Sequence, residues 1–250
     1  MGETEYEAIF KRKSFHAFEN PERSIEEKEI EELRGFLKTT IPLDPSIKVA
    51  MEIVKANETK RHCGSEYCLL LYSERKGDWL ENVGYLGEQA DLYMAAHDLG
   101  ALWYGLGSPK ARTKDGLRYA IMIGFSKMRE EDFRKDIHAA KRKRLEEIWD
   151  GPTYPFSDVI RFAPSACNTQ NWRVRNLRGV LSVYRVKPTR LGIMPRTMAT
   201  YFNRIDLGIF LRFLDVCLLH EGIKTERTLY PDEGEGERDV LVASYRVCDQ

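Results

Sequence analysis

Two long apolar stretches, each closed by a glycine, constrain the fold of this chain more than any other feature of its sequence. The first, LENVGYLGEQADLYMAAHDLG, ends at Gly100, and the second, RIDLGIFLRFLDVCLLHEG, ends at Gly222. Their length and apolar spacing predict helices. When they are aligned on these glycines, an offset of 222 − 100 = 122, the strand-like run 119–125 falls on 241–247 without a gap. The match lies in the apolar pattern, and it predicts two related halves in one chain.

The segments around these helices predict an α+β fold. Each half is expected to run helix, strand, strand, long helix, strand, giving two pseudo-repeated α/β lobes with antiparallel or mixed sheets flanked by the long helices. We expect one domain over 1–250, with a first lobe over 1–128 and a second over 129–250. Ser24 and Glu27 predict a capping box. Strands are predicted at 47–54, 66–74, 116–126, 173–177, 179–188, 224–231 and 238–247, and further helices at 5–13, 24–40 and 129–151.

Charge and cysteine usage argue against several classes of protein. Lys+Arg and Asp+Glu both number 39, so the basic excess typical of nucleic-acid-binding proteins is missing. No apolar run is long enough to span a bilayer, and the N-terminal segment is charged, so we expect no membrane partner. The five cysteines form no CxxC pair and the five histidines are scattered. This pattern predicts no metal site and favours a reducing, cytoplasmic location.

The stretch FKRKSFHAF, residues 10–18, gathers cations and a hydroxyl where a predicted helix ends. Arg12, Lys13, Ser14 and His16 are the residues concerned. Such groups beside backbone N–H groups suit a phosphate. The alternative is a solvated basic face. A second basic run, KRKR at 141–144, lies in the predicted charged helix next to two glutamates, and we expect it to be a solvated face.

The stretch RFAPSACNTQNW, residues 161–172, places two carboxamides and an indole after a run of small residues. The backbone of Pro164, Ser165 and Ala166 allows close approach to a flat ligand, and Asn168 and Gln170 each offer a donor and an acceptor. The alternative is a loop whose amides cap its own backbone while the indole fills the core. The loop cysteine is expected to pack rather than to act as a nucleophile, because no base is identifiable nearby.

Taken together, these motifs resemble the nitroreductase superfamily of FMN-dependent flavoproteins. KRKSFHAF is similar to the family's R-x-S-x-R-x-F pattern, APSACNTQNW to its APS-x-x-N-x-Q-P-W segment, and DLGALWYGLG to the turn after its long helix. The closest resemblance is to the TM nitroreductase subgroup, in which one chain carries two related halves. The chain departs from the pattern at His16, which replaces an arginine, at Asn171, which replaces a proline, and at Gly105, where a tryptophan is common.

The resemblance implies one complete flavin site, because the basic motif occurs only in the first half and the loop motif only in the second. By position, Arg12, Lys13 and Ser14 would contact the FMN phosphate with help from His16. The backbone of the APS segment would line the flavin, and the two loop carboxamides would bond its polar edges. Leu106 and Gly107 would approach N5 of the ring through a backbone N–H. A monomer is then possible through the fused halves, although a homodimer is not excluded.

The function implied by the resemblance is hydride transfer from NAD(P)H through FMN to a nitroaromatic, a quinone or a similar small acceptor, in a ping-pong cycle. The chemistry takes place on the cofactor, so no catalytic side chain is expected. The chain accordingly has no G-x-G-x-x-G fingerprint after a strand. The alternative function is flavin binding without turnover, as a carrier or scaffold. The sequence does not determine the acceptor or the preference between NADH and NADPH.

Overall fold

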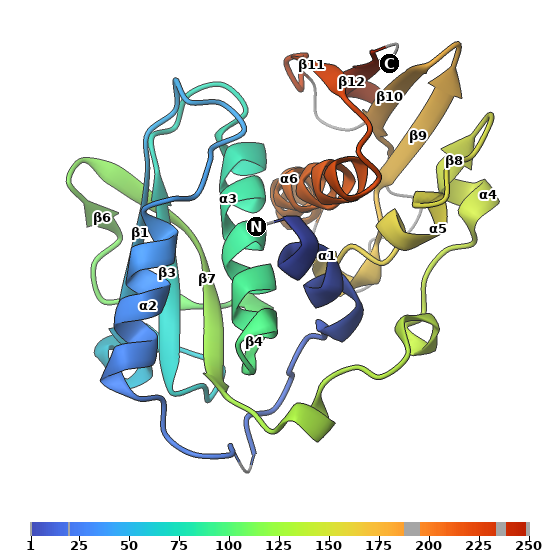
Figure 1. Cartoon of the computed structure of the whole chain (residues 1–250). Helices are drawn as coiled ribbons and strands as arrows, with labels where there is room; N and C mark the ends of the chain where they lie inside the picture. The colour runs from blue at the N-terminus through green and yellow to red at the C-terminus, as the bar shows by residue number, and fades with distance from the viewer. Residues whose placement is uncertain (1, 20, 188–195, 234–238, 249–250) are drawn as a thin grey trace.

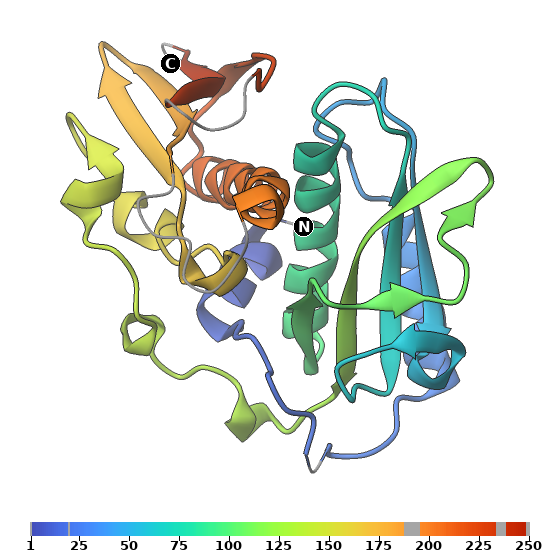
Figure 2. The same cartoon turned by 180° about the vertical axis from the view of Figure 1, so that it is seen from behind.

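Two β-sheets stand on either side of a pair of long helices, α3 (Trp79–Ala96) and α6 (Arg196–His220), in the computed structural model of the chain (Figures 1 and 2). The structure describes residues 2–19, 21–187, 196–233 and 239–248. The predicted α+β class, with antiparallel and mixed sheets, is confirmed.

The first sheet is antiparallel and has the strand order β1-β3-β7-β4, with β6 paired to β7. Every residue of β3 is buried, as is typical of a strand with a continuous apolar run. Its neighbour β7 is buried over its last eight residues. The strands are β1 (Val49–Lys55), β3 (Tyr67–Ser73), β4 (Leu99–Tyr104), β6 (Thr113–Lys114) and β7 (Leu117–Lys127).

The second sheet has the order β11-β12-β10-β9-β8 and is mixed, because β8 runs parallel to β9 and the other pairs are antiparallel. In β9 buried and exposed residues alternate, so one face packs on the core and the other meets solvent. The strands are β8 (Trp149–Asp150), β9 (Trp172–Leu177), β10 (Val180–Arg185), β11 (Thr225–Leu229) and β12 (Val240–Val247). A small separate sheet pairs β2 (Thr59–Arg61) with β5 (Ser108–Pro109).

The long helices touch through their backbones at two glycines. A Cβ on Gly84 would lie 2.0 Å from the carbonyl oxygen of Ile205, and one on Gly208 would lie 1.9 Å from that of Glu81. Only a hydrogen atom fits at either position. The remaining helices are α1 (Gly2–Lys11), α2 (Glu27–Leu37), α4 (Leu145–Ile148), α5 (Ser157–Ile160), η1 (Ala56–Glu58), η2 (Glu130–Asp132), η3 (Ile137–Ala139) and η4 (Ala166–Asn168).

The structure corrects two predicted helix ends. α2 begins at Glu27 and its capping box joins Glu26 to Glu29, so Ser24 is not the N-cap. α3 ends at Ala96, and Asp98 makes the left-handed turn with a φ of 57°. Gly100 therefore lies inside β4. A Cβ there would lie 2.4 Å from the Met128 side chain, so this glycine permits close packing and does not end the helix.

The charged helix predicted over 129–151 is wrong. Residues 129–144, hereafter the strap, form an extended crossing from β7 to α4 with two 3-10 turns, in yellow-green in Figure 1. The strap's backbone groups bond to other elements: the N–H of Arg134 donates to the carbonyl of Lys11 at 3.1 Å, and that of Lys143 to Oε1 of Gln170 at 2.8 Å. Only Phe133 and Ile137 are buried along it, which is too narrow an apolar stripe to hold a helix on the core.

Candidate functional site

The basic segment after α1 lies beside the start of β4. The N–H of Phe15 donates to the carbonyl of Ala101 at 3.0 Å, and Ser14 forms a parallel β-bridge with the same residue. Lys13 and Ser14 are half-buried and His16 is exposed. This pairing places the basic segment beside the first half of β4.

Arg12 is 2% exposed and is tied to acidic residues of α3. Its Nε lies 2.8 Å from Oδ2 of Asp91 and 3.7 Å from Oε1 of Glu88. Burial lowers the pKa of Arg12, but the two acidic neighbours more than offset this and the net change is upward. Nη2 donates to Oγ of Ser14 at 3.4 Å. Arg12 is therefore a buried cation held by α3 through Asp91. Its Nη2 atom faces Ser14, one of the predicted phosphate-binding residues.

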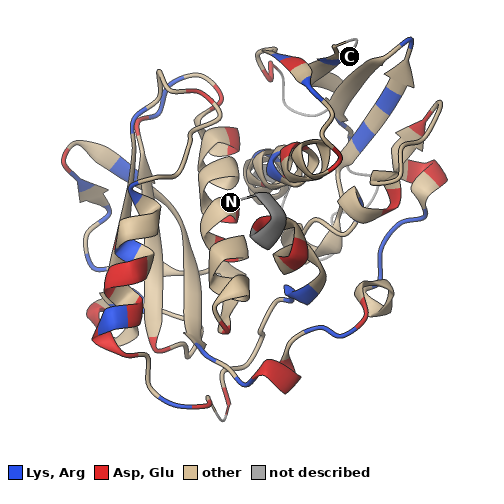
Figure 3. Cartoon of the chain, in the orientation of Figure 1, with Lys and Arg blue, Asp and Glu red and all other residues tan. Residues whose placement is uncertain are grey.

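Two arginines of the strap add positive charge next to Arg12. Burial first, and then the charge of Arg12, lowers the pKa of Arg134 and of Arg142 to about 10 in each case. Neither arginine forms an ion pair within the described part of the chain. Figure 3 shows the strap's basic residues in blue. Cations that are partly buried, close together and without carboxylate partners make a site for an anion.

The sequence did not indicate that Arg134 and Arg142 are partly buried and lack carboxylate partners among the described residues. The KRKR run was predicted to be a solvated face, which holds for Arg144, exposed and paired with Glu146 at 3.0 Å. Arg142 is half-buried and bonds only to oxygens that carry no charge of their own: Oδ1 of Asn168 and the carbonyl of Lys141, both at 3.0 Å, and the carbonyl of Phe162 at 3.2 Å. Its Nε is buried without a hydrogen-bond partner. Because a helix was wrongly predicted over 129–151, Arg142 was expected to lie on its solvated face.

The loop at 163–170 is held in an unusual backbone conformation. Cys167, Asn168 and Gln170 have φ values of 50°, 56° and 49°, the left-handed region that residues with a side chain seldom adopt. Such residues persist only where their surroundings hold them, and they cluster at functional sites. Here Oγ of Ser165 accepts the N–H of Gln170 at 3.0 Å. The N–H of Ala166 donates to both carboxylate oxygens of Asp206 in α6, at 3.0 and 3.1 Å.

The loop's carboxamides bond to the strap and to each other. Oδ1 of Asn168 accepts from Arg142, and its Nδ2 donates to the carbonyl of Lys141 at 2.9 Å. Gln170 is 3% exposed and donates from Nε2 to Asn168 at 3.1 Å. Trp172 is buried and stacks on Phe210 with ring centroids 4.9 Å apart. Gln170 and Trp172 therefore match the alternative interpretation, a loop whose amides bond its own backbone while the indole fills the core. Asn168, in contrast, is exposed.

The turn at 104–107 meets the same helix as the loop. Gly107 donates its N–H to the carbonyl of Tyr104 at 3.1 Å, and Leu106 is 54% exposed at the tip. A Cβ on Gly105 would lie 2.6 Å from the ring of Phe202 in α6. Phe202 is four residues before Asp206, so both lie on one face of α6. The turn and the loop, which come from different halves of the chain, therefore lie over one face of α6.

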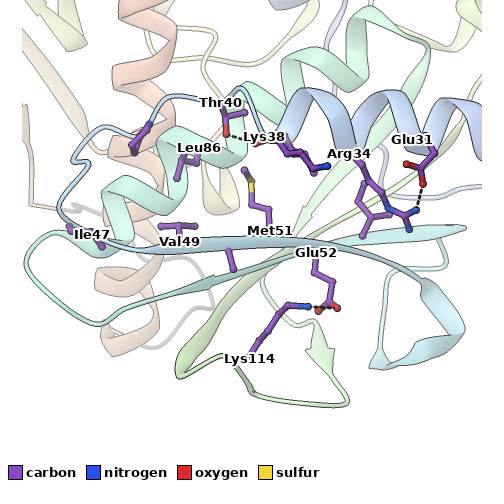
Figure 4. Close-up of a pocket in the computed structure, with 14 residues that line it drawn as sticks. Glu31, Arg34, Lys38, Thr40, Ile47, Val49, Met51, Glu52, Leu86 and Lys114 are labelled. Atoms are coloured by element: carbon purple, nitrogen blue, oxygen red, sulfur yellow. Dashed lines mark hydrogen bonds and ion pairs between the residues drawn. The ribbon is translucent and has the colours of Figure 1, made fainter.

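A large pocket elsewhere on the molecule shares no residue with this site. It has a volume of about 730 Å³ and lies between α2 and β1, with Val49 and Met51 among its apolar residues (Figure 4). Two of its three lining cations are paired, Arg34 with Glu31 and Lys114 with Glu52 at 2.6 Å. The third, Lys38, is exposed, so the pocket lacks the partly buried, uncompensated charge found at the strap.

No group of three or more His, Cys, Asp or Glu side chains among the described residues is placed to hold a metal ion. No helix in this described part of the chain is both long enough and apolar enough to cross a membrane.

A family model matches most of the chain. The family described as "Putative TM nitroreductase" matches residues 4–216. A crystal structure titled as a putative nitroreductase from Thermotoga maritima MSB8 is 18% identical, covers 96% of this chain and 92% of its own, and has a TM-score of 0.63. That likeness establishes the fold. No curated protein matches the chain.

A second solved structure shares a smaller part of the chain. It is titled as a putative NADH oxidase from Clostridium acetobutylicum, is 14% identical, and covers 59% of this chain and 99% of its own with a TM-score of 0.42.

Proposed function

Because this chain belongs to the TM nitroreductase family, we propose that it is an FMN-dependent oxidoreductase that takes hydride from NAD(P)H and passes it to a nitroaromatic, a quinone or a similar acceptor in a ping-pong cycle. The observation that carries the proposal is that four segments, the turn, the loop, the strap and the basic segment, lie next to one another in series. The turn at 104–107 and the loop at 163–170 share a face of α6, and the loop is bonded to a strap whose arginines lie beside Arg12.

The anionic end of FMN fits the basic cluster. A phosphate monoester carries close to two negative charges near neutral pH and accepts several charge-assisted hydrogen bonds. We assign its contacts to Arg134 and Arg142 of the strap together with Lys13, Ser14 and His16 of the basic segment. Arg12 contributes its charge and orients Ser14, since its Nε is already bonded to Asp91. The mutual repulsion of these cations would be relieved by the bound phosphate.

The ring end fits the turn and the loop. We assign the backbone N–H donor near N5 to Leu106, because the N–H of Gly107 is already bonded within the turn. The backbone of Pro164, Ser165 and Ala166 forms the facing wall. Asn168, exposed and oriented by Gln170, bonds the polar edge of the flavin. Bound FMN supplies the hydride chemistry, and these residues position it and tune it without a titrating side chain.

We further propose that the chain is two fused halves related by a pseudo-twofold axis. The strand orders correspond, β1-β3-β7-β4 in the first sheet and β9-β10-β12-β11 in the second. At the helix crossing Gly84 meets Ile205 and Gly208 meets Glu81. These contacts are reciprocal, since 208 − 84 and 205 − 81 both equal 124. The offset is two residues longer than the one from sequence because Gly100 lies in a strand and does not end its helix.

A second pair of contacts has the same offset. Trp103 of β4 donates to Oδ2 of Asp91 in α3, and Arg227 of β11 donates to Oδ2 of Asp215 in α6. Here 227 − 103 and 215 − 91 again equal 124. The basic segment and the flavin loop each occur in one half only, so we propose one FMN per chain, with a monomer as the minimal active unit. All five cysteines are free, which supports a reducing, cytoplasmic location.

The proposal is tested on purified protein saturated with FMN and passed through a desalting column. We expect a yellow protein with one flavin per chain, bleached by NADPH or NADH under anaerobic conditions and recoloured by a quinone. A yellow protein that neither nucleotide bleaches would support the carrier function. A colourless protein that takes up no added FMN would exclude both.

A further inference from the structure

Two buried side chains occupy equivalent positions in the two long helices and make the same contact. Asn82 of α3 accepts the N–H of Asp44 on its Oδ1 at 3.1 Å. Asp206 of α6 accepts the N–H of Ala166 at 3.0 Å. They are 0% and 3% exposed, and 206 − 82 equals the pseudo-twofold offset of 124. In each half, then, a buried side chain of the long helix accepts a backbone N–H of the loop that leads into a strand, β1 in the first half and β9 in the second.

The two residues differ in that only Asp206 can bind a proton. Burial raises the pKa of Asp206 to about 8, and the hydrogen bond from Ala166 opposes this shift. No charged group in the described part of the chain contributes to the shift. Arg142 and Lys143 of the strap bond Asn168 and Gln170, and Cys167 is exposed on the same loop. Asn82 shows that a neutral amide is sufficient to hold such a loop, so the carboxyl group adds something beyond support.

We propose that Asp206 is a positioning residue that links the geometry of the 163–170 loop, and with it flavin affinity, to proton binding. The proposal rests on the proposed function. The ionised carboxylate accepts the Ala166 N–H in a charge-assisted bond, which is stronger than a bond to the neutral acid. Three left-handed residues follow Ala166 within four positions, so the loop depends on this anchor. Flavin affinity is therefore higher above the pKa of Asp206 than below it.

The test compares the wild type with Asp206→Asn, which installs the side chain that the first half uses. The probe is riboflavin, whose affinity does not include a titrating phosphate, and binding is followed by flavin fluorescence. In the wild type the affinity should rise by about threefold or more between roughly pH 6.5 and pH 9.5. In Asp206→Asn it should stay flat while the flavin-free protein remains folded. The reciprocal variant Asn82→Asp should keep the wild-type profile, because its new acid holds a loop without the flavin motif.

A second measurement does not depend on flavin or on the variant's folding. The amide resonance of Ala166 in the flavin-free wild type should titrate with a midpoint near the pKa of Asp206. An Ala166 amide that does not titrate, or an Asp206→Asn profile that matches the wild type, would overturn the proposal. Titration of Ala166 in a protein that binds no flavin at any pH would instead leave the loop linkage standing and reject the proposed function.

Discussion

Arg142 donates a hydrogen bond from Nη1 to Oδ1 of Asn168 over 3.0 Å, joining the strap to the loop that carries the second motif. The same guanidinium lies close enough to Arg12 for the two charges to repel. This one side chain therefore connects the proposed phosphate end of the site to the proposed ring end.

Arg142→Gln should lower FMN affinity by about tenfold or more and riboflavin affinity by much less. The reason is that hydrogen bonds to charged groups are worth about 1.5–3 kcal/mol, and tenfold in affinity is about 1.4 kcal/mol. Calorimetric titration with both flavins measures the difference. Arg144→Gln is the matched control, since Arg144 has a side chain 74% exposed on the same strap. Equal losses for both flavins would mean that Arg142 acts only by supporting the loop.

Gly84→Ala should destabilise the protein by about 2 kcal/mol or more, because the new methyl group would lie 2.0 Å from the Ile205 carbonyl oxygen and force the long helices apart. Gly35→Ala is the control. Gly35 lies inside α2, and a methyl group added there would have no atom within 4 Å, so alanine should stabilise the protein by about 0.5–1 kcal/mol through helix propensity. Urea unfolding at neutral pH separates the two, and similar effects of both variants would contradict the close crossing.

The sequence was sufficient for the parts of the fold that periodicity controls. Both long helices and the central strands β3 and β7 form where apolar spacing predicted them, because burial of those residues dominates their local conformation. α6 begins at Arg196, however, before the apolar segment that predicted it. The sequence was not sufficient to predict the segments in which tertiary contacts replace local hydrogen bonds. The strap has the composition of a solvated helix, yet its N–H groups bond to Lys11 and Gln170, residues far away in sequence.

The candidate site, too, could be predicted from the sequence only in part. Motif order pointed to the basic segment, the turn and the loop, and the structure brings the last two onto one helix face. The contributions of Arg134, Arg142 and Asp206 could not be predicted, because each depends on what packs around a charge and not on its neighbours in the chain. The acidic, glycine-rich segment 232–237 has the composition of a solvated loop, yet Asp232 is buried; the residues from 234 to 238 lie outside those described.

Asp232→Ala should destabilise the protein by about 3–5 kcal/mol, because Nε and Nη2 of the buried Arg185 both donate to Asp232 at 2.6 Å and the variant removes this carboxylate from the buried ion pair. Urea unfolding measures the loss. The control is Asp150→Ala, which breaks an exposed pair with Arg175 at 3.2 Å and should change stability by less than about 1 kcal/mol. A loss at Asp232 no larger than at Asp150 would show that the pair is open to water.

Glu88→Gln should stabilise the protein near neutral pH and leave it unchanged in acid. Glu88 is fully buried, and burial first, then the charge of Asp91, raises its pKa well above the ordinary value despite the opposing charge of Arg12. The unfolded chain releases this proton near its ordinary pKa, whereas the folded chain keeps it to higher pH. The stability that Glu88 contributes is therefore complete below about pH 4.5 and declines by about 1.4 kcal/mol per pH unit until the folded pKa is passed.

The measurement is the free energy of unfolding in urea at several values between about pH 4 and pH 8, where the variant should lose that part of the slope. The exposed Glu7, changed to Gln, serves as the control and should leave the slope as it is. A Glu88→Gln variant that is less stable than the wild type throughout this range would mean that the carboxylate is ionised and holds Arg12 together with Asp91. Removing it would then leave the guanidinium under-compensated, and Arg12 would depend on two carboxylates instead of one.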